Sequence, residues 1–415
     1  MFIKRIEIVN YKSFKDFKIE LDKFNVLIGA NASGKSNFIQ LFAFIRNIIN
    51  YGLDNAISLQ GGIEYLKNIN LSKSDNFSVK IILEPQYGFG HKTTEGIIGI
   101  KIYETIYEFT LRSSRGKLKY AIVEDKLTNK CDFMKLRQTD KGKIEEKGKI
   151  GTGEIVYSIK DGKIDISFDK PDTINIKIDN IHPPFIREEK IDHNTLLIEN
   201  LLYFFPILDD LSEISIYDFD PKIPKKGTPI TGKAELEEDG SNLSIVLKKI
   251  IEDKNKKRKL FNLVSDVLPF IGDLNVEKFS DKSLLFKLKE VYSKKEYLPA
   301  SLISDGTINI TALIIAIFFE KKPITIIEEP ERNIHPYLIS RLIEMMKEAS
   351  KNKQIIITTH NPEIVKYAGL ENILLISRDK EGFSKIIRPV DKEEVKIFLK
   401  NEIGIEELYV QNLLG

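Results

Sequence analysis

The hydrophobic residues near the start of the chain follow two successive patterns. Apolar and polar residues alternate over residues 2–10 and 17–21, which predicts two strands with one buried face each. A short apolar run at residues 24–28 then predicts a buried strand. After a glycine-containing loop, apolar residues recur at helical spacing on almost every side as far as about Ile49, which predicts a buried helix.

Short alternating runs of apolar and polar residues dominate the middle of the chain, from about Asn76 to Asp179. Gly, Asp, Asn and Pro separate these runs, as expected for an antiparallel sheet built from hairpins. The pair Asp161-Gly162 is the clearest two-residue turn, because both residue types tolerate the left-handed backbone that such a turn requires.

The pattern becomes helical from about residue 194. Two helical segments, at about 194–211 and 239–268, flank a loop at 218–227 that is rich in proline, lysine and glycine. The second segment opens with Asp239-Gly240-Ser241-Asn242. There the side chain of Asp239 or Ser241 is the expected N-cap.

Strands and helices alternate in the last third of the chain, which predicts a parallel sheet. The expected order is strand 283–289, helix 307–319, strand 323–327, helix 336–350, strand 354–358 and strand 372–377. The fold class is therefore α/β. Its four expected parts are an N-terminal part at 1–75, an antiparallel β-lobe at 76–190, a small helical insertion at 191–268 and a C-terminal lobe at 269–415.

The composition narrows the classes of protein that fit. The 415 residues include 63 Lys and Arg against 61 Asp and Glu, so the net charge of +2 does not by itself indicate a polyanion partner. Basic runs at 141–149, 222–226 and 254–259 would contact nucleic-acid phosphates only if they shared one face. The single cysteine, Cys131, excludes a disulfide framework, and no apolar run reaches the roughly 18 residues of a membrane span. We expect a cytoplasmic protein without a membrane partner.

The loop between the first buried strand and its helix carries the first candidate site. It reads Gly29-Ala30-Asn31-Ala32-Ser33-Gly34-Lys35-Ser36, the full G-x-x-x-x-G-K-[ST] pattern of a P-loop. Gly29 and Gly34 let the backbone curl so that its N–H groups surround the β- and γ-phosphates. Lys35 adds a positive charge, Ser36 offers a hydroxyl to Mg²⁺, and the helix N-terminus favours the anion.

Two later strands end in side chains suited to phosphate chemistry. The strand at 323–327 runs into Glu328 and Glu329, and the strand at 354–358 is followed closely by His360. In a P-loop protein, Glu328 would reach Mg²⁺ through water and Glu329 would polarise the attacking water. A neutral His360 at the same sheet edge would donate a hydrogen bond to the γ-phosphate or to that water.

The turn Ser304-Asp305-Gly306-Thr307, before the helix at 307–319, is a second device for binding anions. The P-loop already supplies one phosphate cradle. We therefore expect Ser304 and Gly306 to serve a nucleotide held by a second copy of the chain. The alternative is an ordinary N-cap made by Ser304 or Asp305.

These four motifs, taken in their order along the chain, resemble the ABC-type ATPase head, a P-loop NTPase. The chain looks most similar to the soluble group that includes RecF, the structural-maintenance-of-chromosomes (SMC) proteins and OLD nucleases. Further matches to the "predicted ATPase" branch of this group are residues 8–14, 218–221, 239–243, 328–336 and 406–409. Some members of that branch are ATPase subunits of antiphage systems such as Septu and PARIS.

The resemblance implies a role for each matching residue. It makes Glu329 the catalytic base, His360 the switch histidine, and Ser36 and Glu328 the Mg²⁺ ligands. ATP would be held by Gly29, Asn31, Ala32, Ser33, Gly34, Lys35, Ser36 and Asn37, with Lys12 near the nucleotide and Ser304 and Gly306 reaching the partner's nucleotide. Hydrolysis would then need a head-to-tail dimer with two ATP molecules at its interface.

The sequence departs from the family pattern at four points. Ala32 replaces a common glycine, Asp305 and Thr307 alter the signature turn, Glu328 stands where Asp is commoner, and Gln60 stands where the SMC proteins carry an arginine. Gln86 and Gln138 remain the open candidates for the Q-loop glutamine.

Three functions stay open at this stage. The first is an ATPase whose nucleotide state controls a separate effector protein, a nuclease or toxin, in antiphage defence. The second is a RecF-like DNA-repair clamp whose ATPase is coupled to DNA. The third is a nucleotide sensor with negligible turnover.

Overall fold

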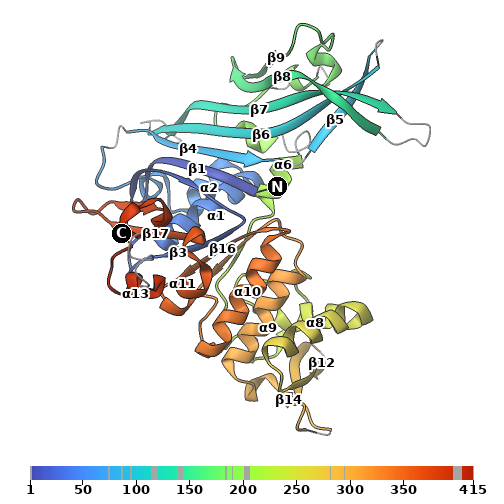
Figure 1. Cartoon of the computed structure of the whole chain (residues 1–415), viewed down its shortest axis with the longest axis vertical. Coiled ribbons are helices and arrows are strands. Elements are labelled where there is room, and N and C mark those ends of the chain that lie inside the picture. Colours follow the sequence, from blue (N-terminus) through green and yellow to red (C-terminus); the bar gives the residue numbers. More distant parts are fainter. Residues whose placement is uncertain are drawn as a thin grey trace. The chain divides into compact units, whose positions relative to one another are not determined.

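The computed structural model groups the chain into two compact units that are interleaved along the sequence (Figure 1). Unit 1 comprises Met1–Asp22, Gln40–Ser212 and Arg378–Lys385, and unit 2 comprises Lys23–Ile39, Glu213–Ser377 and Ile386–Gly415. The described residues are 2–72, 75–85, 87–93, 96–113, 120–138, 144–182, 185–188, 190–200, 206–280, 282–293, 295–395 and 404–414.

The sheet of unit 1 is mainly antiparallel, as the alternating runs predicted. Its strands pair in the order β2-β1-β4-β6-β7-β8-β9, with β5 on β6, and β18 joins β2 through one parallel pair. The bounds are β1 (Phe2–Tyr11), β2 (Phe14–Glu20), β4 (Phe77–Glu84), β5 (Tyr87–Thr93), β6 (Gly96–Ser113), β7 (Tyr120–Gln138), β8 (Ile144–Lys160), β9 (Lys163–Asp169) and β18 (Ser384–Ile387).

The turn between β8 and β9 is the two-residue hairpin turn expected from Asp161-Gly162. Both residues have positive φ, 52° and 70°, and the flanking residues Lys160 and Lys163 are paired. These angles match the right-handed twist of the strands, so the local sequence alone specifies this hairpin.

The helices of unit 1 are short apart from the first. They are the C-terminal part of α1 (Lys35–Tyr51), α2 (Leu53–Leu59), α3 (Ile63–Leu66), the 3₁₀ turn η1 (Ile178–Asn180), α4 (Phe185–Glu188), α5 (Leu197–Asn200) and α6 (Pro206–Ser212). The apolar residues of α1 are buried over most of its length, as their spacing predicted.

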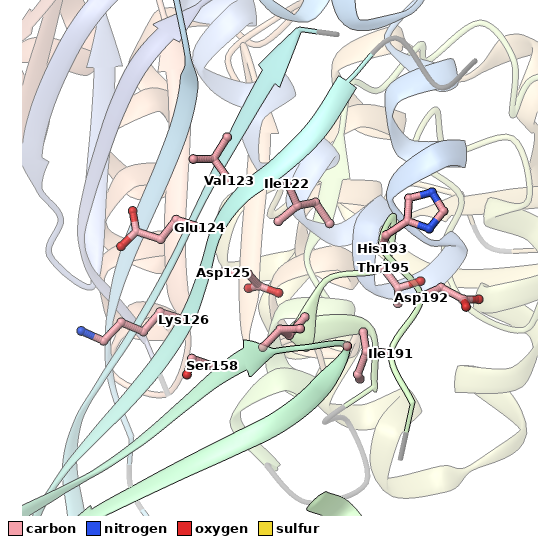
Figure 2. Close-up of a pocket in the computed structure, with 12 residues that line it drawn as sticks. Ile122, Val123, Glu124, Asp125, Lys126, Ser158, Ile191, Asp192, His193 and Thr195 are labelled. Carbon is pink, nitrogen blue, oxygen red and sulfur yellow. The ribbon is translucent and has the colours of Figure 1, made fainter. Parts of the chain in front are cut away.

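Unit 1 contains a pocket of about 480 Å³ beside β7 and the segment that precedes α5 (Figure 2). Asp125 lines this pocket and is almost fully buried, and its Oδ2 accepts a hydrogen bond of 2.6 Å from the Leu197 N–H. Burial raises the pKa of Asp125 to about 7. A carboxyl group in this environment is more stable when protonated.

The raised pKa of Asp125 makes the stability of the fold depend on pH. Between the ordinary carboxyl pKa and about 7 the folded chain binds the extra proton, so the free energy of unfolding falls as pH rises through this range. Asp125→Asn keeps the acceptor for Leu197 and removes the charge. We expect it to raise the free energy of unfolding at pH 8 by up to about 4 kcal/mol, and by clearly less at pH 5.

Chemical denaturation of the wild type and the Asp125→Asn variant at both pH values checks this expectation. The exposed neighbour Glu124 provides the matched control, Glu124→Gln, which should change little. An equal effect of Asp125→Asn at pH 5 and pH 8 would show that Asp125 is ionised over the whole range.

Unit 2 is built on a parallel sheet with the order β10-β15-β16-β3-β17. Its strands are β3 (Phe24–Ile28), β10 (Ser215–Tyr217), β15 (Ile324–Glu328), β16 (Gln354–Thr359) and β17 (Ile373–Arg378). The central strands β3 and β16 are buried along their whole length, as the continuous apolar runs predicted. The expected α/β fold class is thus confirmed, and the sheet that contains β3 has both parallel and antiparallel pairs, as expected for a mixed sheet around the P-loop.

The remaining elements of unit 2 include a small antiparallel sheet, in which β13 pairs with β11, β12 and β14. These strands are β11 (Thr228–Pro229), β12 (Ile271–Ser280), β13 (Ser283–Glu290) and β14 (Leu298–Pro299). The helices are α7 (Leu243–Glu252), α8 (Lys254–Val267), α9 (Asp305–Phe318), α10 (Ile339–Ser350), α11 (Pro362–Ala368) and α13 (Ile405–Val410), with 3₁₀ turns η3 (Ala300–Leu302), η4 (Pro336–Leu338), η5 (Leu370–Asn372) and η6 (Pro389–Asp391). In the described part of the chain, no helix combines the length and apolar character needed to cross a membrane.

The structure differs from the sequence-based outline in three places. Residues 23–39 group with unit 2 rather than with the rest of 1–75, because β3 pairs with β16 and β17. The three-residue strand β10 lies inside the segment expected to be a helical insertion. The N-cap position of α7 is Asn242 and not Asp239 or Ser241. The Asn242 side chain makes no capping hydrogen bond, because it bonds the backbone of Lys233, Glu235 and Glu237 instead.

Candidate functional site

The loop between β3 and α1 has the backbone that a P-loop sequence predicts. Gly29, Ala32 and Gly34 have φ of 155°, 60° and 120°, and α1 begins at Lys35. A Cβ atom on Gly29 would lie 2.3 Å from the Ile376 carbonyl oxygen, so only glycine fits there. Ala32 occupies the left-handed region, which costs an alanine about 1–2 kcal/mol and explains why glycine is common at this position.

Lys35 lies across the mouth of its own loop. Its Nζ donates hydrogen bonds to the carbonyl oxygens of Gly29 (2.7 Å) and Ala30 (3.1 Å). Partial burial lowers the pKa of Lys35, against the opposing effect of the nearby Glu329 and Glu328 carboxylates. A cation that is half removed from water and held only by carbonyl oxygens is well placed to bind an anion.

The rest of the loop faces both the protein and the solvent. Ser33 and Gly34 are buried, Asn37 is half-buried, and Asn31, Ala32 and Ser36 are exposed. The Ser33 N–H donates to the Ala30 carbonyl at 3.2 Å, which closes the turn. The exposed hydroxyl of Ser36 therefore stands at the start of α1, where a P-loop serine binds Mg²⁺.

Parallel pairing brings the two carboxylates to the same sheet edge as the P-loop. Glu328 ends β15 opposite Thr358 of β16, and Thr358 is in turn paired with Leu27 of β3. The carboxyl ends of these three strands lie side by side, so the residues that follow them share one edge. The structure thus brings together Lys35, Glu328, Glu329 and His360, as the strand order in the sequence predicted.

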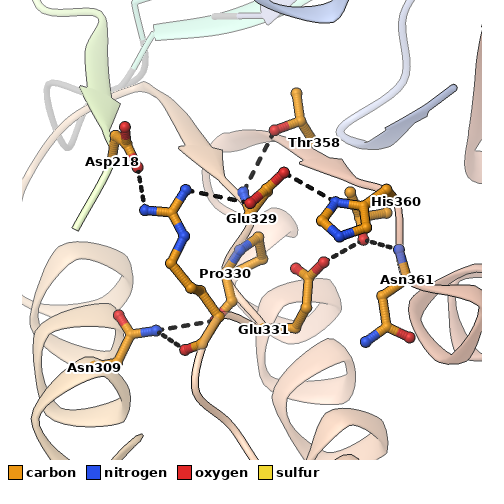
Figure 3. Close-up of polar contacts among 10 residues, drawn as sticks. Asp218, Asn309, Glu329, Pro330, Glu331, Thr358, His360 and Asn361 are labelled. Carbon is orange, nitrogen blue, oxygen red and sulfur yellow. Dashed lines mark hydrogen bonds and ion pairs between the residues drawn. The ribbon is translucent and has the colours of Figure 1, made fainter. Parts of the chain in front are cut away.

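The backbone of Glu329 is strained, and both of its carboxylate oxygens have hydrogen-bond partners (Figure 3). Its φ is 42°, in the left-handed region, and its N–H donates to the Thr358 carbonyl at 3.0 Å. Glu329 Oε1 lies 2.9 Å from His360 Nδ1, and Oε2 accepts a hydrogen bond of 3.2 Å from Arg332. Strain of this kind costs about 1–3 kcal/mol and is characteristic of functional sites.

The two neighbouring carboxylates have opposite pKa shifts. Although partial burial acts to raise the pKa of Glu329, the hydrogen bonds from Arg332 and His360 and the positive charge of Arg332 lower it overall. Burial, together with the negative charges of Asp218 and Glu329, raises the pKa of Glu328. Glu329 is therefore ionised and able to accept a proton from water, whereas the ionised form of Glu328 needs a cation nearby.

The residues present fit a Mg²⁺ ion that is bound together with a nucleotide. Burial raises the pKa of Glu328 even though the positive charges of Arg332 and Lys35 oppose this shift, and Ser36 is exposed. Among the described residues, no group of three or more His, Cys, Asp or Glu side chains is arranged to hold a metal by itself. This is the usual situation for Mg²⁺, which keeps waters and phosphate oxygens as most of its ligands.

Several residues of this site were not predicted from the sequence. Arg332 donates to Asp218 Oδ1 at 2.8 Å as well as to Glu329, and Glu331 is buried with its carboxylate bonded to the Thr359 hydroxyl. Thr359 Oγ1 in turn accepts from the Asn361 N–H at 2.9 Å. Glu331 therefore fixes the end of β16 that carries His360.

The Ser304 turn forms the N-terminus of α9. The Ser304 side chain caps this helix by accepting from the Thr307 N–H at 3.3 Å, which agrees with the ordinary N-cap interpretation. In the described chain its other hydroxyl contact is also within the turn, to Thr307 Oγ1 at 2.8 Å. Ser304 is exposed, as a residue serving a second copy would be. The contacts thus leave both interpretations of the turn open.

Gly306 has a packing role that the sequence did not reveal. A Cβ atom on Gly306 would lie 2.4 Å from the Asn333 carbonyl oxygen. One turn later, Asn309 Nδ2 donates to the Arg332 carbonyl at 2.7 Å. The start of α9 therefore packs directly on residues 330–333, the segment that follows Glu328 and Glu329.

The remaining residues discussed from the sequence belong to unit 1. Lys12 belongs to unit 1, has a φ of 45°, and its Nζ contacts Gln40 on α1. Gln60 is the C-cap of α2. Gln86 lies outside the described residues, and for Gln138 only the backbone, at the end of β7, is described. The structure therefore does not identify a Q-loop glutamine.

Fold and site together define an ATPase head of the ABC/AAA-like type, in which the P-loop follows β3, the two carboxylates lie at the end of β15, and β16 separates these two parallel strands. Residues 24–366 match the family described as "AAA domain, putative AbiEii toxin, Type IV TA system". The chain belongs to this family, and the resemblance to an ABC-type ATPase head is confirmed.

The individual relative that we describe matches over a short part of the chain. The uncharacterized protein MJECL43 of Methanocaldococcus jannaschii is 29% identical over 93 residues, which are 22% of this chain. The match spans about a quarter (24%) of the length of that relative.

Solved structures that resemble the chain include heads of SMC proteins. They include an SmcHead bound to the C-winged helix domain of ScpA (15% identity, TM-score 0.44), covering 93% of this chain and 98% of that one. The SMC head domain from Thermotoga maritima has 13% identity and a TM-score of 0.43, covering 94% and 99%. A Pyrococcus furiosus Smc head bound to the C-terminal domain of ScpA has 15% identity and a TM-score of 0.46, covering 97% and 100%.

Proposed function

We propose that the protein binds and hydrolyses ATP as a head-to-tail dimer and that its nucleotide state controls a separate effector protein in a defence or toxin–antitoxin system. The observation that carries the hydrolytic part is the arrangement of Glu329 between His360 and Arg332 at the edge that bears Lys35. The effector part rests on the family, whose description refers to a type IV toxin–antitoxin system.

In this proposal, different residues of the chain bind the phosphates, hold Mg²⁺ and accept the proton of the attacking water. The loop N–H groups and Lys35 bind the phosphates, Ser36 and Glu328 hold Mg²⁺, and the ion screens the phosphate charge. Glu329 accepts a proton from the attacking water, and a positioned base of this kind contributes about 10²–10⁴-fold to a rate. His360 is bonded to Glu329 through Nδ1, which leaves its other ring nitrogen for the phosphate or the water.

Dimerisation is proposed from the exposed state of the Ser304 turn. Leu302, two residues before Ser304, is 69% exposed, and Tyr337 is equally exposed in the turn that begins α10. A serine hydroxyl and a helix N-terminus beside exposed apolar side chains suit a surface that closes on a phosphate held by another copy.

The test uses the concentration dependence of hydrolysis. If each site needs two copies, the ATPase rate per chain rises with protein concentration and then reaches a plateau. Ser304→Arg should remove this rise and leave ATP binding to each chain intact, because the long charged side chain obstructs the shared interface. The exposed serine Ser167 on β9 gives the matched control, Ser167→Arg, which should behave as wild type. A rate per chain that is independent of concentration, and unaffected by Ser304→Arg, would contradict the dimer.

The two alternative functions give other results in the same assays. A DNA-repair clamp would show DNA-stimulated hydrolysis that falls steeply with salt. In the basic run of α8, Lys257 already pairs with Asp273 (3.3 Å) and Lys259 lies over the rings of Phe318 and Phe319, so we favour a protein effector. A nucleotide sensor would bind ATP with no measurable single-turnover hydrolysis.

A further inference from the structure

The loop at residues 218–227, named here the coupling loop, makes two ion pairs that the proposed mechanism does not use. At its start, Asp218 Oδ1 accepts a hydrogen bond of 2.8 Å from Arg332. Further along, Lys225 Nζ lies 2.5 Å from Asp305 Oδ1, in the first turn of α9. One loop thus contacts both the partner of the catalytic base and the turn that contains Ser304.

The Arg332 guanidinium is divided between two carboxylates (Figure 3). One terminal nitrogen donates to Asp218, and the other donates to Glu329 at 3.2 Å. An arginine normally pairs with one carboxylate through two parallel hydrogen bonds. Because Asp218 occupies one nitrogen, Glu329 receives a single hydrogen bond on Oε2, and its Oε1 remains with His360.

The Asp218–Arg332 ion pair has little role in folding. The side chains of Asp218 and Arg332 are 57% and 40% exposed. Exposed pairs of this type contribute about 0–1 kcal/mol to stability. The geometry that this pair imposes on Glu329, rather than the stability that it adds, is therefore its main physical effect.

The conformation of the coupling loop is fixed by two prolines, a buried aromatic ring and backbone hydrogen bonds. Pro221 and Pro224 fix two backbone angles, and Phe219 is buried and stacked on Tyr217 with ring centroids 5.1 Å apart. The backbone N–H groups of Asp218 and Asp220 donate to the carbonyls of Glu238 and Asp239 at 2.9 Å and 3.2 Å. Turn hydrogen bonds within the loop, from Ile223 to Asp220 and from Lys226 to Ile223, complete its framework.

We infer that the coupling loop is a positioning element that joins the two ends of the ATPase site. Asp218 orients Glu329 through Arg332, and Lys225 fixes the Ser304 turn through Asp305. In the proposed dimer, Glu329 acts on the nucleotide of its own chain and the Ser304 turn acts on the nucleotide of the partner. The coupling loop therefore links the two nucleotides through one chain, an inference that rests on the proposed function.

The first arm of the test removes the charge of Asp218. In Asp218→Asn only a neutral acceptor is left for Arg332, so the guanidinium can turn both nitrogens to the charged Glu329, which covers the oxygen that must accept the proton. We expect hydrolysis at saturating ATP to slow at least about tenfold, with KM and ATP affinity unchanged. Asp220→Asn is the matched control in the same loop, because the Asp220 side chain accepts from the Lys222 N–H and asparagine keeps that bond.

Arg332 provides an internal check on this arm. Arg332→Gln should also lower kcat and leave KM unchanged, and Arg332→Lys should restore part of the rate. The double variant Asp218→Asn with Arg332→Gln should be no slower than Arg332→Gln alone, because Asp218 acts through Arg332. Additive losses in the double variant would overturn the positioning role of Asp218.

The second arm removes the Lys225 contact. In the Glu329→Gln background, Lys225→Gln should weaken the ATP-dependent dimer at least about fivefold, measured as the concentration of half-maximal dimer, and should not change ATP binding to single chains. Lys226→Gln is the matched control, since the Lys226 side chain is exposed. An unchanged dimer concentration in Lys225→Gln would overturn this half of the inference.

The outcomes distinguish failure of the positioning role of the coupling loop from failure of the proposed ATPase function. If wild-type protein does not hydrolyse ATP, or Glu329→Gln does not dimerise with ATP, the proposed function fails. If both occur and Asp218→Asn and Lys225→Gln behave as their controls, the coupling loop is not a positioning element, and the proposed function stands.

Discussion

Replacing Lys35 with alanine is expected to abolish measurable ATP binding. Lys35 is the one P-loop side chain that brings a positive charge to the phosphates, and it is half-buried with only carbonyl oxygens as hydrogen-bond partners. Hydrogen bonds to charged groups are worth about 1.5–3 kcal/mol each, so the loss of two corresponds to at least about a hundredfold in affinity. Isothermal titration calorimetry with ATP and Mg²⁺ measures the affinity of the variant and of the wild type for ATP.

The control for Lys35→Ala is Lys321→Ala, which removes an exposed lysine of the same unit. It should bind ATP as wild type does. Because the Lys35 ammonium bonds only carbonyl oxygens of its own loop, Lys35→Ala should keep the fold, which circular dichroism can verify. An affinity for ATP within about twofold of wild type would contradict the assignment of the phosphate cradle.

Replacing Glu329 with glutamine is expected to leave ATP binding intact and to slow hydrolysis at least about a hundredfold. Glutamine has the same shape and still accepts a hydrogen bond from Arg332 or His360, so the geometry of the site persists. It has no basic oxygen to take the proton of the attacking water. Single-turnover hydrolysis of labelled ATP separates this chemical step from product release.

Glu344→Gln is a suitable control, because Glu344 is an exposed carboxylate on α10 in the same unit. Its single-turnover rate should equal that of the wild type. A Glu329→Gln rate within about threefold of wild type would show that another group is the base.

The strand-end residues of the site were predictable because parallel pairing is a strong constraint. Once an apolar strand is followed by a P-loop, other apolar strands of the same α/β pattern must end at the same edge. Glu328, Glu329 and His360 follow such strands directly, so the sequence locates them without any knowledge of side-chain contacts.

The residues that orient Glu329 were not predictable. Asp218 and Arg332 are 114 residues apart, and nothing in the local pattern of either segment requires the other. Strand β10, which brings Asp218 to the edge of the sheet, has only three residues and no periodicity to detect. Asn242 similarly stands at the N-cap position of α7 without a capping bond, because its side chain bonds Lys233, Glu235 and Glu237 in the folded loop.

Gly29 has a role that the sequence predicts, whereas Gly306 has a contact that the sequence could not predict. Gly29 is required by the P-loop pattern, and the structure adds its close approach to the Ile376 carbonyl. Gly306 was interpreted only as part of an anion-binding turn. Its contact with the Asn333 carbonyl is a tertiary constraint that holds whether or not a second copy binds.

The central claim is that two copies share their ATP molecules, and the mass of the Glu329→Gln variant in solution tests it most directly. With ATP and Mg²⁺, light scattering should give twice the chain mass of 47.6 kDa, and the same variant carrying Ser304→Arg should give the mass of one chain. A single-chain mass for Glu329→Gln at saturating ATP would contradict the shared site.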